Sequence, residues 1–343
     1  KSARHALATT YGADGFALLT ALTAPDTPRT VRTLPMVATL WRVWLQQFYG
    51  PSETPVLRAD ADVPMPAGLI HSPYDPDARY SMKRGTTWIG YKVHITESCD
   101  SDQPRLVTAV HTTPATTPDD PLVPQIHATL AKKALLPATH LVDCGYTSSE
   151  TLVQSQQDYA VRVLGPVAHD PSWQARERTG YDNQAFVIDW DQQQARCPQG
   201  HTSGKWRFEQ DITGQAVVHI RFLRKDCSPC PVRTHCTRGK HEPRSVTIRT
   251  QIYHEALQQA RQYQRTPAFH REYALRSGIE SSISQGIRHV GLRRTRFIGL
   301  EKTHLQHVLS AVALNVIRIG AWLDQPRQTP PRRSALSRLV ASG

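Results

Sequence analysis

The chain lacks the features of a membrane or secreted protein. No stretch of about 18 residues or more is free of charged side chains, whereas a membrane-spanning helix needs about 20 apolar residues. The first residues, Lys1 to His5, are not followed by a clean apolar core, so we expect no signal peptide. Six cysteines in 343 residues are too few for a disulfide-dense scaffold. We therefore expect a protein without a membrane span, in the reducing environment of the cytoplasm.

Positive charge is what the chain has in excess. Lysine and arginine number 41 against 29 aspartates and glutamates, which gives a net charge of +12 and a pI near 9.6. Such an excess favours a polyanionic partner, nucleic acid above all, although many soluble proteins are simply basic. The chain begins with Lys1 rather than methionine and reads as though it starts within a helix. We therefore expect an N-terminally truncated fragment.

The order of the expected elements is that of an α/β protein with an insertion. In the core, an antiparallel hairpin precedes a helix, a strand, a helix and a strand. Short strands separated by polar turns then enclose most of the cysteines. We divide the chain into an N-terminal helical region with a proline-rich connector (1–68), the first part of the core (69–165), a cysteine-containing β-rich insertion (166–250), a helical part that completes the core (251–325) and a disordered basic tail (326–343).

Three expectations concern the helices. The segment from Gly12 to Gly15 should break one N-terminal helix from the next, and Pro35 should begin another. Residues from about 252 to 282 should form one long helix. Residues from about 302 to 323 should form another, and because apolar residues surround it on nearly all sides, we expect it to be buried.

Two acidic residues in distant settings are the candidates for chemistry. Asp143 ends a short apolar run, where open α/β sheets bind ligands, although it could also be a turn residue that closes the strand. Glu280 shares a helix face with Tyr273 and Arg276, whereas most helix glutamates are simply solvated. Two carboxylates, with bases beside one of them, suggest a metal site that acts on phosphodiesters.

Two further clusters have both a functional and an ordinary interpretation. Arginines at 288, 293, 294 and 296 follow Glu280 and form either a DNA-binding groove or a solvated surface; their position beside Glu280 favours the groove. Four cysteines fall within 40 residues and form either a tetrahedral zinc site or a set of reduced, partly buried thiols. These candidate ligands are Cys197, Cys227, Cys230 and Cys236, while Cys99 and Cys144 look structural.

Six short motifs occur in a fixed order between residues 69 and 323. They are Ser-Pro-Tyr-Asp-Pro-Asp-Ala-Arg-Tyr at 72–80, Gly-Tyr-Lys-Val-His at 90–94, Asp-Cys-Gly-Tyr at 143–146, Cys-Pro-Gln-Gly at 197–200, Cys-x2-Cys-Pro-x4-Cys at 227–236 and Tyr-x2-Arg-x3-Glu at 273–280. The ordered set resembles the DDE transposases of bacterial insertion sequences, in the branch that carries a Cys-rich insertion.

The resemblance implies an RNase H-like catalytic core, with catalytic carboxylates at Asp143 and Glu280. The family's first catalytic Asp has no convincing match; we expect it upstream of Lys1, and Asp75 is the best candidate within the chain. The family's helix signature ends in a lysine. The corresponding residue of this chain is Ile287, and the nearest base is Arg288, one residue later. The implied cofactors are two catalytic Mg²⁺ ions, in addition to the structural Zn²⁺ considered above. The residues expected to contact DNA are Tyr273, Arg276, Arg288, Arg293 and Arg294.

The function implied is cleavage at transposon ends and strand transfer into target DNA. Its partners would be double-stranded DNA and a second copy of the chain, as a homodimer on the DNA, in association with the nucleoid. Two alternatives remain: an RNase H-like nuclease without strand transfer, and an inactive DNA-binding remnant with a zinc module. With one of three carboxylates missing, the fragment by itself should be inactive, because each carboxylate supports both metal positions.

Overall fold

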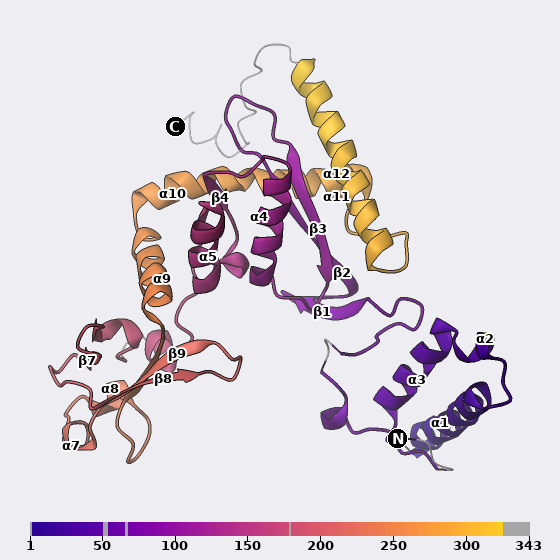
Figure 1. Ribbon diagram of the computed structural model, residues 1–343, viewed down its shortest axis with the longest axis horizontal. Coiled ribbons are helices and arrows are strands. Elements are labelled where there is room, and N and C mark those ends of the chain that lie inside the picture. The colour runs from indigo at the N-terminus through magenta and orange to yellow at the C-terminus, as the bar shows by residue number, and fades with distance from the viewer. Residues whose placement is uncertain (1, 51–53, 66–67, 178–179, 325–343) are drawn as a thin grey trace, which may run out of the picture. The chain divides into compact units, whose positions relative to one another are not determined.

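The computed structural model describes residues 2–50, 54–65, 68–177 and 180–324. The expected basic tail, 326–343, lies outside the described residues. The chain divides into two compact units, and the first is discontinuous: it comprises residues 1–117 and 278–343, whereas the second comprises residues 118–277. Figure 1 labels the elements of both. The mixture of helices and strands is compatible with the α/β class.

The N-terminal part of the first unit is helical, as expected. It contains α1 (Ser2–Thr23), α2 (Arg29–Arg32) and α3 (Pro35–Gln47). The predicted break in the first helix is wrong, because α1 runs through Gly12 and Gly15 without interruption. The glycines instead allow close packing: a Cβ at Gly15 would lie 2.0 Å from the Trp44 ring, and Trp44 Nε1 donates to the Gly12 carbonyl at 3.1 Å.

The first unit also contains an antiparallel sheet. Its strands are β1 (Arg79–Lys83), β2 (Thr86–Glu97) and β3 (Val107–Pro114), in the order β1-β2-β3. The predicted hairpin is confirmed, since β2 and β3 pair in register from Tyr91 opposite Pro114 to Thr96 opposite Ala109. Two helices that follow the second unit in sequence, α11 (Gly278–Val290) and α12 (Leu300–Leu323), complete this unit.

Helix α12 lies along β3 (Figure 1). The Asn315 side chain accepts from the Val107 amide at 2.7 Å and donates to its carbonyl at 2.9 Å. The expectation that α12 is buried is wrong: one face packs on the strand through residues such as His307 and Leu314, whereas Leu309 is 59% exposed. Of the described helices, only α12 has the length and composition of a membrane span, but its hydrogen bonds to β3 favour sheet packing.

The second unit begins with a small parallel βαβ arrangement. Strands β4 (Thr139–Leu141) and β5 (Arg162–Leu164) pair in parallel, and α4 (Val123–Lys132) and α5 (Ser149–Tyr159) accompany them. Val123, Val142 and Val163 form their buried core. Helix α5 begins with the Ser148 side chain accepting from the Thr151 amide and ends at Ala160 in the left-handed conformation.

Short strands occupy the cysteine-containing segment of the second unit. Phe186, Phe222 and the inward side chains of the strands form a separate core. A three-stranded antiparallel sheet has the order β10-β9-β8, and β6 and β7 form a hairpin. The bounds are α6 (Trp173–Glu177), β6 (Val187–Asp189), β7 (Gln194–Arg196), β8 (Lys205–Gln210), β9 (Ala216–Arg221), α7 (Arg224–Cys227), α8 (Arg233–Cys236) and β10 (Ser245–Arg249).

The predicted single helix from 252 to 282 is wrong, because the chain divides it into three. Helix α9 (Gln251–Tyr263) ends before Thr266, whose side chain caps α10 (Pro267–Ala274) by accepting from the Phe269 amide. Pro267 stands at the first helical position, where its missing N–H costs no hydrogen bond. A 3₁₀ turn, Leu275–Ser277, separates α10 from α11.

Candidate active site

Asp143 lies where the sequence places it, directly after a strand of the parallel pair. Val142 still donates to the Leu164 carbonyl at 2.9 Å, and the chain then turns into the 3₁₀ segment Cys144–Tyr146. The Asp143 side chain makes no capping hydrogen bond to that turn, and it is 52% exposed. The Asp143 backbone takes part in the turn, since its carbonyl accepts from the Tyr146 amide at 3.0 Å, while its side chain stays half-exposed at the carboxyl end of the strand.

Two residues of the predicted helix signature meet Asp143 within the second unit. Arg276 Nη2 lies 2.6 Å from Asp143 Oδ2, and the arginine side chain is only 18% exposed. Tyr273 stacks on Phe269 with ring centroids 5.3 Å apart. Burial raises the pKa of Tyr273, and the Asp143 carboxylate also raises it, whereas Arg276 lowers it. The structure thus brings Tyr273, Arg276 and Asp143 together.

A second carboxylate, Asp119, belongs to the same cluster and was not predicted. A Cβ at Gly145 would lie 3.0 Å from Asp119 Oδ2, so glycine is what lets this loop approach the carboxylate. Both acids act on Tyr146. Burial is the main cause that raises the pKa of Tyr146, Asp119 and Asp143 raise it further, and Arg276 lowers it. Asp119 follows the hairpin in a Thr-Thr-Pro-Asp-Asp segment, and no periodicity or spacing there marks it as functional.

The donor set suits a hard divalent cation but is incomplete by itself. Carboxylate oxygens are the ligands that Mg²⁺ prefers, together with water, and the half-exposed Asp143 can accept a cation from solvent. Arg276 at present neutralises that carboxylate. Within the described residues, no group of three or more His, Cys, Asp or Glu side chains is arranged to hold a metal ion. Asp119 and Asp143 therefore provide part of a site.

Glu280 lies in the first turn of α11, in the first unit, with its side chain exposed. The backbone beside it is covered by Arg105, since a Cβ at Gly278 would lie 1.0 Å from Arg105 Nη1. A second acid in this region, Glu97, was not predicted. It ends β2, accepts from Ser282 Oγ, and pairs with Arg318 Nη1 at 3.0 Å with only 6% of its side chain exposed. This buried ion pair links β2, α11 and α12 within the first unit.

Asp75 has a structural partner in the first unit. Tyr91 donates its hydroxyl to Asp75 Oδ1 at 2.6 Å, and burial, followed by this contact, raises the pKa of Tyr91. Asp77, in the same motif, accepts from the Leu300 amide at the start of α12 at 3.3 Å. The Asp-Pro-Asp motif therefore fastens the loop before β1, and a metal-binding role for Asp75 stays a prediction.

The predicted DNA-contacting arginines are exposed on α11 and on the loop that follows it. Arg288 lies near the end of α11, and Arg293 and Arg294 lie in the loop between α11 and α12. Gln306 of α12 fixes this loop: it donates to the Arg294 carbonyl at 2.7 Å and accepts from the Arg296 amide at 2.9 Å. A loop held in this way presents its basic side chains at low entropic cost.

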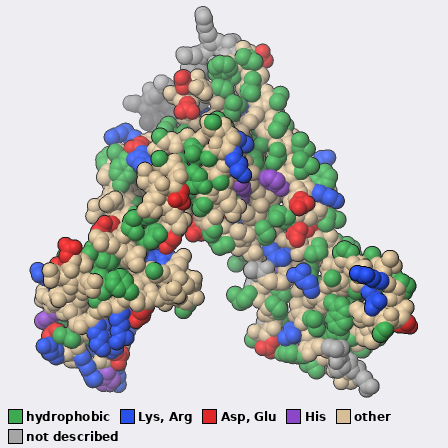
Figure 2. All heavy atoms as spheres, in the orientation of Figure 1, with side chains coloured by type: hydrophobic (Ala, Val, Ile, Leu, Met, Phe, Trp, Pro, Cys, Tyr) green, Lys and Arg blue, Asp and Glu red, His purple; other side chains and the backbone are tan. Residues whose placement is uncertain are grey.

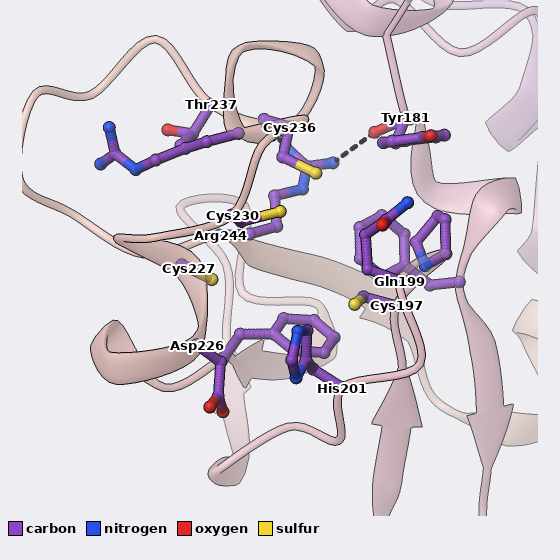
Figure 3. A pocket seen from close by; sticks show the side chains of 14 residues that line it. Tyr181, Cys197, Gln199, His201, Asp226, Cys227, Cys230, Cys236, Thr237 and Arg244 are labelled. Carbon is purple, nitrogen blue, oxygen red and sulfur yellow. Dashed lines mark hydrogen bonds between the residues drawn. The ribbon is translucent and has the colours of Figure 1, made fainter.

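The four cysteines proposed as zinc ligands line one pocket of the second unit (Figure 3). Burial raises the pKa of Cys236 to about 11, and Arg244 lowers it. The other three cysteines of the pocket raise it further, which shows that they lie close to Cys236. Cys144 is exposed and Cys99 is partly buried, and both are free thiols. The sequence grouping of Cys197, Cys227, Cys230 and Cys236 is therefore also a grouping in space.

A family model described as a transposase DDE domain matches residues 196–320. The match covers a little over a third of the chain and includes the four clustered cysteines and the Tyr273, Arg276 and Glu280 signature, but not Asp143. No curated protein and no solved structure matches the chain. The family match supports a DDE transposase family, and with it a transposase-type enzyme activity. Such domains generally use a divalent metal, and DNA is the partner that this family implies.

Proposed function

We propose that the protein is a DDE transposase that cleaves DNA at the ends of an insertion sequence and joins the freed ends to target DNA. The observation that carries the proposal is the cluster of Asp143 with Arg276 and Tyr273, because it unites the second predicted acid with the helix signature that the family model covers. The order of three antiparallel strands, a helix, a strand, a helix and a strand supports an RNase H-like core.

Asp143 and Glu280 are the proposed ligands of catalytic Mg²⁺. Glu280 follows Arg276 by four residues in the helix signature. Within this chain the third carboxylate has two candidates: Asp75, the best match that the sequence offers, and Asp119, favoured by its place beside Gly145 and Tyr146. Bound Mg²⁺ would supply activation of the attacking oxygen and stabilisation of the leaving oxygen.

The chain's own side chains have separate tasks in this proposal. Arg276 pairs with Asp143 in the free protein, and its guanidinium group would be available to contact a DNA phosphate when a metal binds the carboxylate. Tyr273, whose pKa is raised by burial, is available as a hydroxyl donor. The loop of Arg293 and Arg294, with Arg288, contacts the DNA backbone. We further propose that the protein works in the cytoplasm as a homodimer on DNA.

The test measures both metal binding and cleavage in the full chain. Mn²⁺ binding is followed by paramagnetic resonance, and cleavage on a plasmid that carries the gene with its flanking DNA. Asp143→Asn and Glu280→Gln should each weaken Mn²⁺ binding, and in a chain that supplies all three carboxylates each should also reduce cleavage about 100-fold or more. Asp158→Asn, which changes an exposed aspartate of α5 in the second unit, is the matched control and should change neither.

The other outcomes discriminate between the candidates. Comparison of Asp75→Asn with Asp119→Asn identifies the third ligand, because only the true ligand should lower Mn²⁺ affinity. Cleavage without joined products would favour the hydrolytic nuclease over the transposase. Unchanged Mn²⁺ binding in both Asp143→Asn and Glu280→Gln would refute the proposed metal site and favour a DNA-binding remnant.

A further inference from the structure

Three separate segments bring four thiols to one pocket in the second unit. Cys197 follows β7, Cys227 ends α7, and Cys236 ends α8, with Cys230 in the turn between these two short helices. In Figure 3 the four sulfur atoms face the space between them. The cysteines are free rather than disulfide-bonded. Free thiols that converge from distant segments are an arrangement that soft divalent metals bind.

The chain around the first thiol is folded as a tight knuckle. The Cys197 carbonyl accepts from the Gly200 amide at 2.8 Å, and the Cys197 amide donates to the His201 carbonyl at 2.9 Å. Gly200 has a φ of +83°, a left-handed conformation that glycine adopts without strain. This turn folds the Cys-Pro-Gln-Gly segment back on itself and presents the Cys197 side chain at the wall of the pocket.

Two partly buried arginines line the same pocket. Arg233 donates through Nη2 to the Gly239 carbonyl at 2.8 Å, and Arg244 donates through Nη1 to the Cys236 carbonyl at 3.1 Å. In the described part of the chain, Nε of Arg233 and Nε of Arg244 are buried without a hydrogen-bond partner. Burying an N–H donor without a partner is costly, so these two Nε–H groups are donors that four neutral thiols leave unsatisfied.

Thiolates bound to zinc would account for both arginines. Four thiolates around one Zn²⁺ carry a net charge of −2, which two guanidinium groups offset, and metal-bound sulfur accepts hydrogen bonds from N–H donors. Asp226 also lines the pocket, but in Figure 3 its carboxylate points away from the sulfur atoms. Arg244 is the cation that acts on a thiol directly, because it lowers the pKa of Cys236 against the effect of burial.

The described part of the surrounding fold has a small core. The core of the β-rich segment consists of seven buried residues. The connection between β9 and β10, residues 222–244, contains only the four-residue helices α7 and α8, and helices that short have no stability of their own. Small units with such cores are commonly held together by a disulfide or a metal. Within the described residues no three ligands stand in finished coordination geometry, so the pocket must contract for its sulfur atoms to reach about 2.3 Å from zinc.

We propose that Cys197, Cys227, Cys230 and Cys236 bind one structural Zn²⁺, with Arg233 and Arg244 neutralising the tetrathiolate. Binding converts four thiols to thiolates and releases four protons, with no change in oxidation state. The metal would fasten the 222–244 connection to the knuckle after β7. Asp143 does not line this pocket, so the zinc proposal can be tested independently of the transposase proposal.

The first experiment measures metal content and ligand type in the full chain. Zinc should be present at about one per chain, and Co²⁺ substitution should give the intense visible bands of tetrahedral cobalt with thiolate ligands. Cys227→Ser and Cys236→Ser should lose the metal, whereas Cys99→Ser should keep it. His201→Asn, which removes the imidazole at the pocket, should also keep it. Absence of metal after purification with added zinc, or disulfides among the four cysteines under reducing conditions, would overturn the proposal.

Two further measurements remain decisive if the cysteine variants fail to fold. In the unchanged protein, alkylation should spare the four cysteines with zinc present and modify them after a chelator is added, while Cys144 reacts in both states. Equal reactivity in the two states would contradict the site. Arg244→Gln should weaken Co²⁺ affinity about 10- to 100-fold, and Arg244→Lys, which retains the charge, should recover part of it. Unchanged affinity in Arg244→Gln would remove the charge argument on which the proposal depends.

Discussion

At the scale of single residues, two buried histidines lie close to the candidate active site along the chain. His127 Nε2 is 3.0 Å from His140 Nδ1, and His140 stands in β4, three residues before Asp143. Burial, with a smaller contribution from His127, lowers the pKa of His140 to about 4. Burial also lowers the pKa of His127. Both histidines are therefore neutral in the folded protein at neutral pH.

The pair makes the second unit sensitive to acid. A histidine whose pKa is lower in the folded than in the unfolded chain favours folding above its unfolded pKa, about 6.5. That contribution is lost as the pH falls from about 6.5 towards 4, and for His140 the loss at pH 4 is about 3 kcal/mol. Hydrogen exchange of the β4 and β5 amides from pH 7 to pH 4 should show the loss. His140→Gln should flatten this pH dependence, and His169→Gln, at an exposed position of the same unit, should leave it unchanged.

Individual residues also define how far the sequence could predict the site. Asp143 could be placed because a strand has a period of two and ends at a recognisable turn. Asp119 and Glu97 could not, because their significance comes from neighbours distant in sequence: Gly145 and Tyr146 for Asp119, and Arg318 for Glu97. From the sequence alone, a carboxylate in a loop or at the end of a strand is interpreted as a solvated residue, because its partners are not known.

At the scale of elements, local signals located the strands better than the helices. The β2–β3 hairpin was predictable from alternation, whereas Thr266 and Pro267 divide what the helical period alone presents as one helix. Helix α12 was assigned to the interior because its sequence is apolar on nearly all sides. Its buried side instead includes polar residues such as Thr303 and His307, because these reach hydrogen-bond partners on the sheet and in the preceding loop. Hydrophobicity does not reveal such pairings.

Asn315 makes two of the hydrogen bonds that join α12 to β3. Asn315→Ala would leave both the amide and the carbonyl of Val107 without this partner, and an unsatisfied buried polar group costs about 1–3 kcal/mol. We expect urea denaturation of the first unit to show a loss of about 2 kcal/mol. Val316→Ala, on the exposed side of the same helix, should change the free energy of unfolding by less than about 0.5 kcal/mol. Equal effects of the two changes would contradict the assignment of the helix faces.

At the scale of the whole molecule, the chain order and the spatial units differ. The first unit is formed by both ends of the chain and the second by its middle, so a division by sequence alone assigns α11 and α12 to the segment that precedes them. The net charge likewise does not show where the charged side chains lie. The net charge of +12 is a property of the composition, but Figure 2 shows lysine and arginine side chains gathered locally, for example where α7 and α8 lie in Figure 1.

The distribution of charge predicts how DNA binding should depend on salt. If basic side chains neutralise phosphates, the logarithm of the binding constant falls linearly with the logarithm of the salt concentration, by about 0.9 for each contacted phosphate. Arg293→Ala and Arg294→Ala should each weaken binding at every sequence and reduce that slope by about 1, because both residues lie exposed in the loop that Gln306 fixes.

The matched control is Lys132→Ala, which removes the same charge at an exposed position of α4 in the second unit. Fluorescence anisotropy with a labelled duplex, between 50 and 200 mM salt on the scale where such contacts are resolved, measures the slopes. A slope that falls equally for Lys132→Ala and Arg293→Ala would mean that DNA responds only to the total charge. A smaller effect of Lys132→Ala would assign the contact to the loop, because only a positioned cation releases a counterion from a particular phosphate.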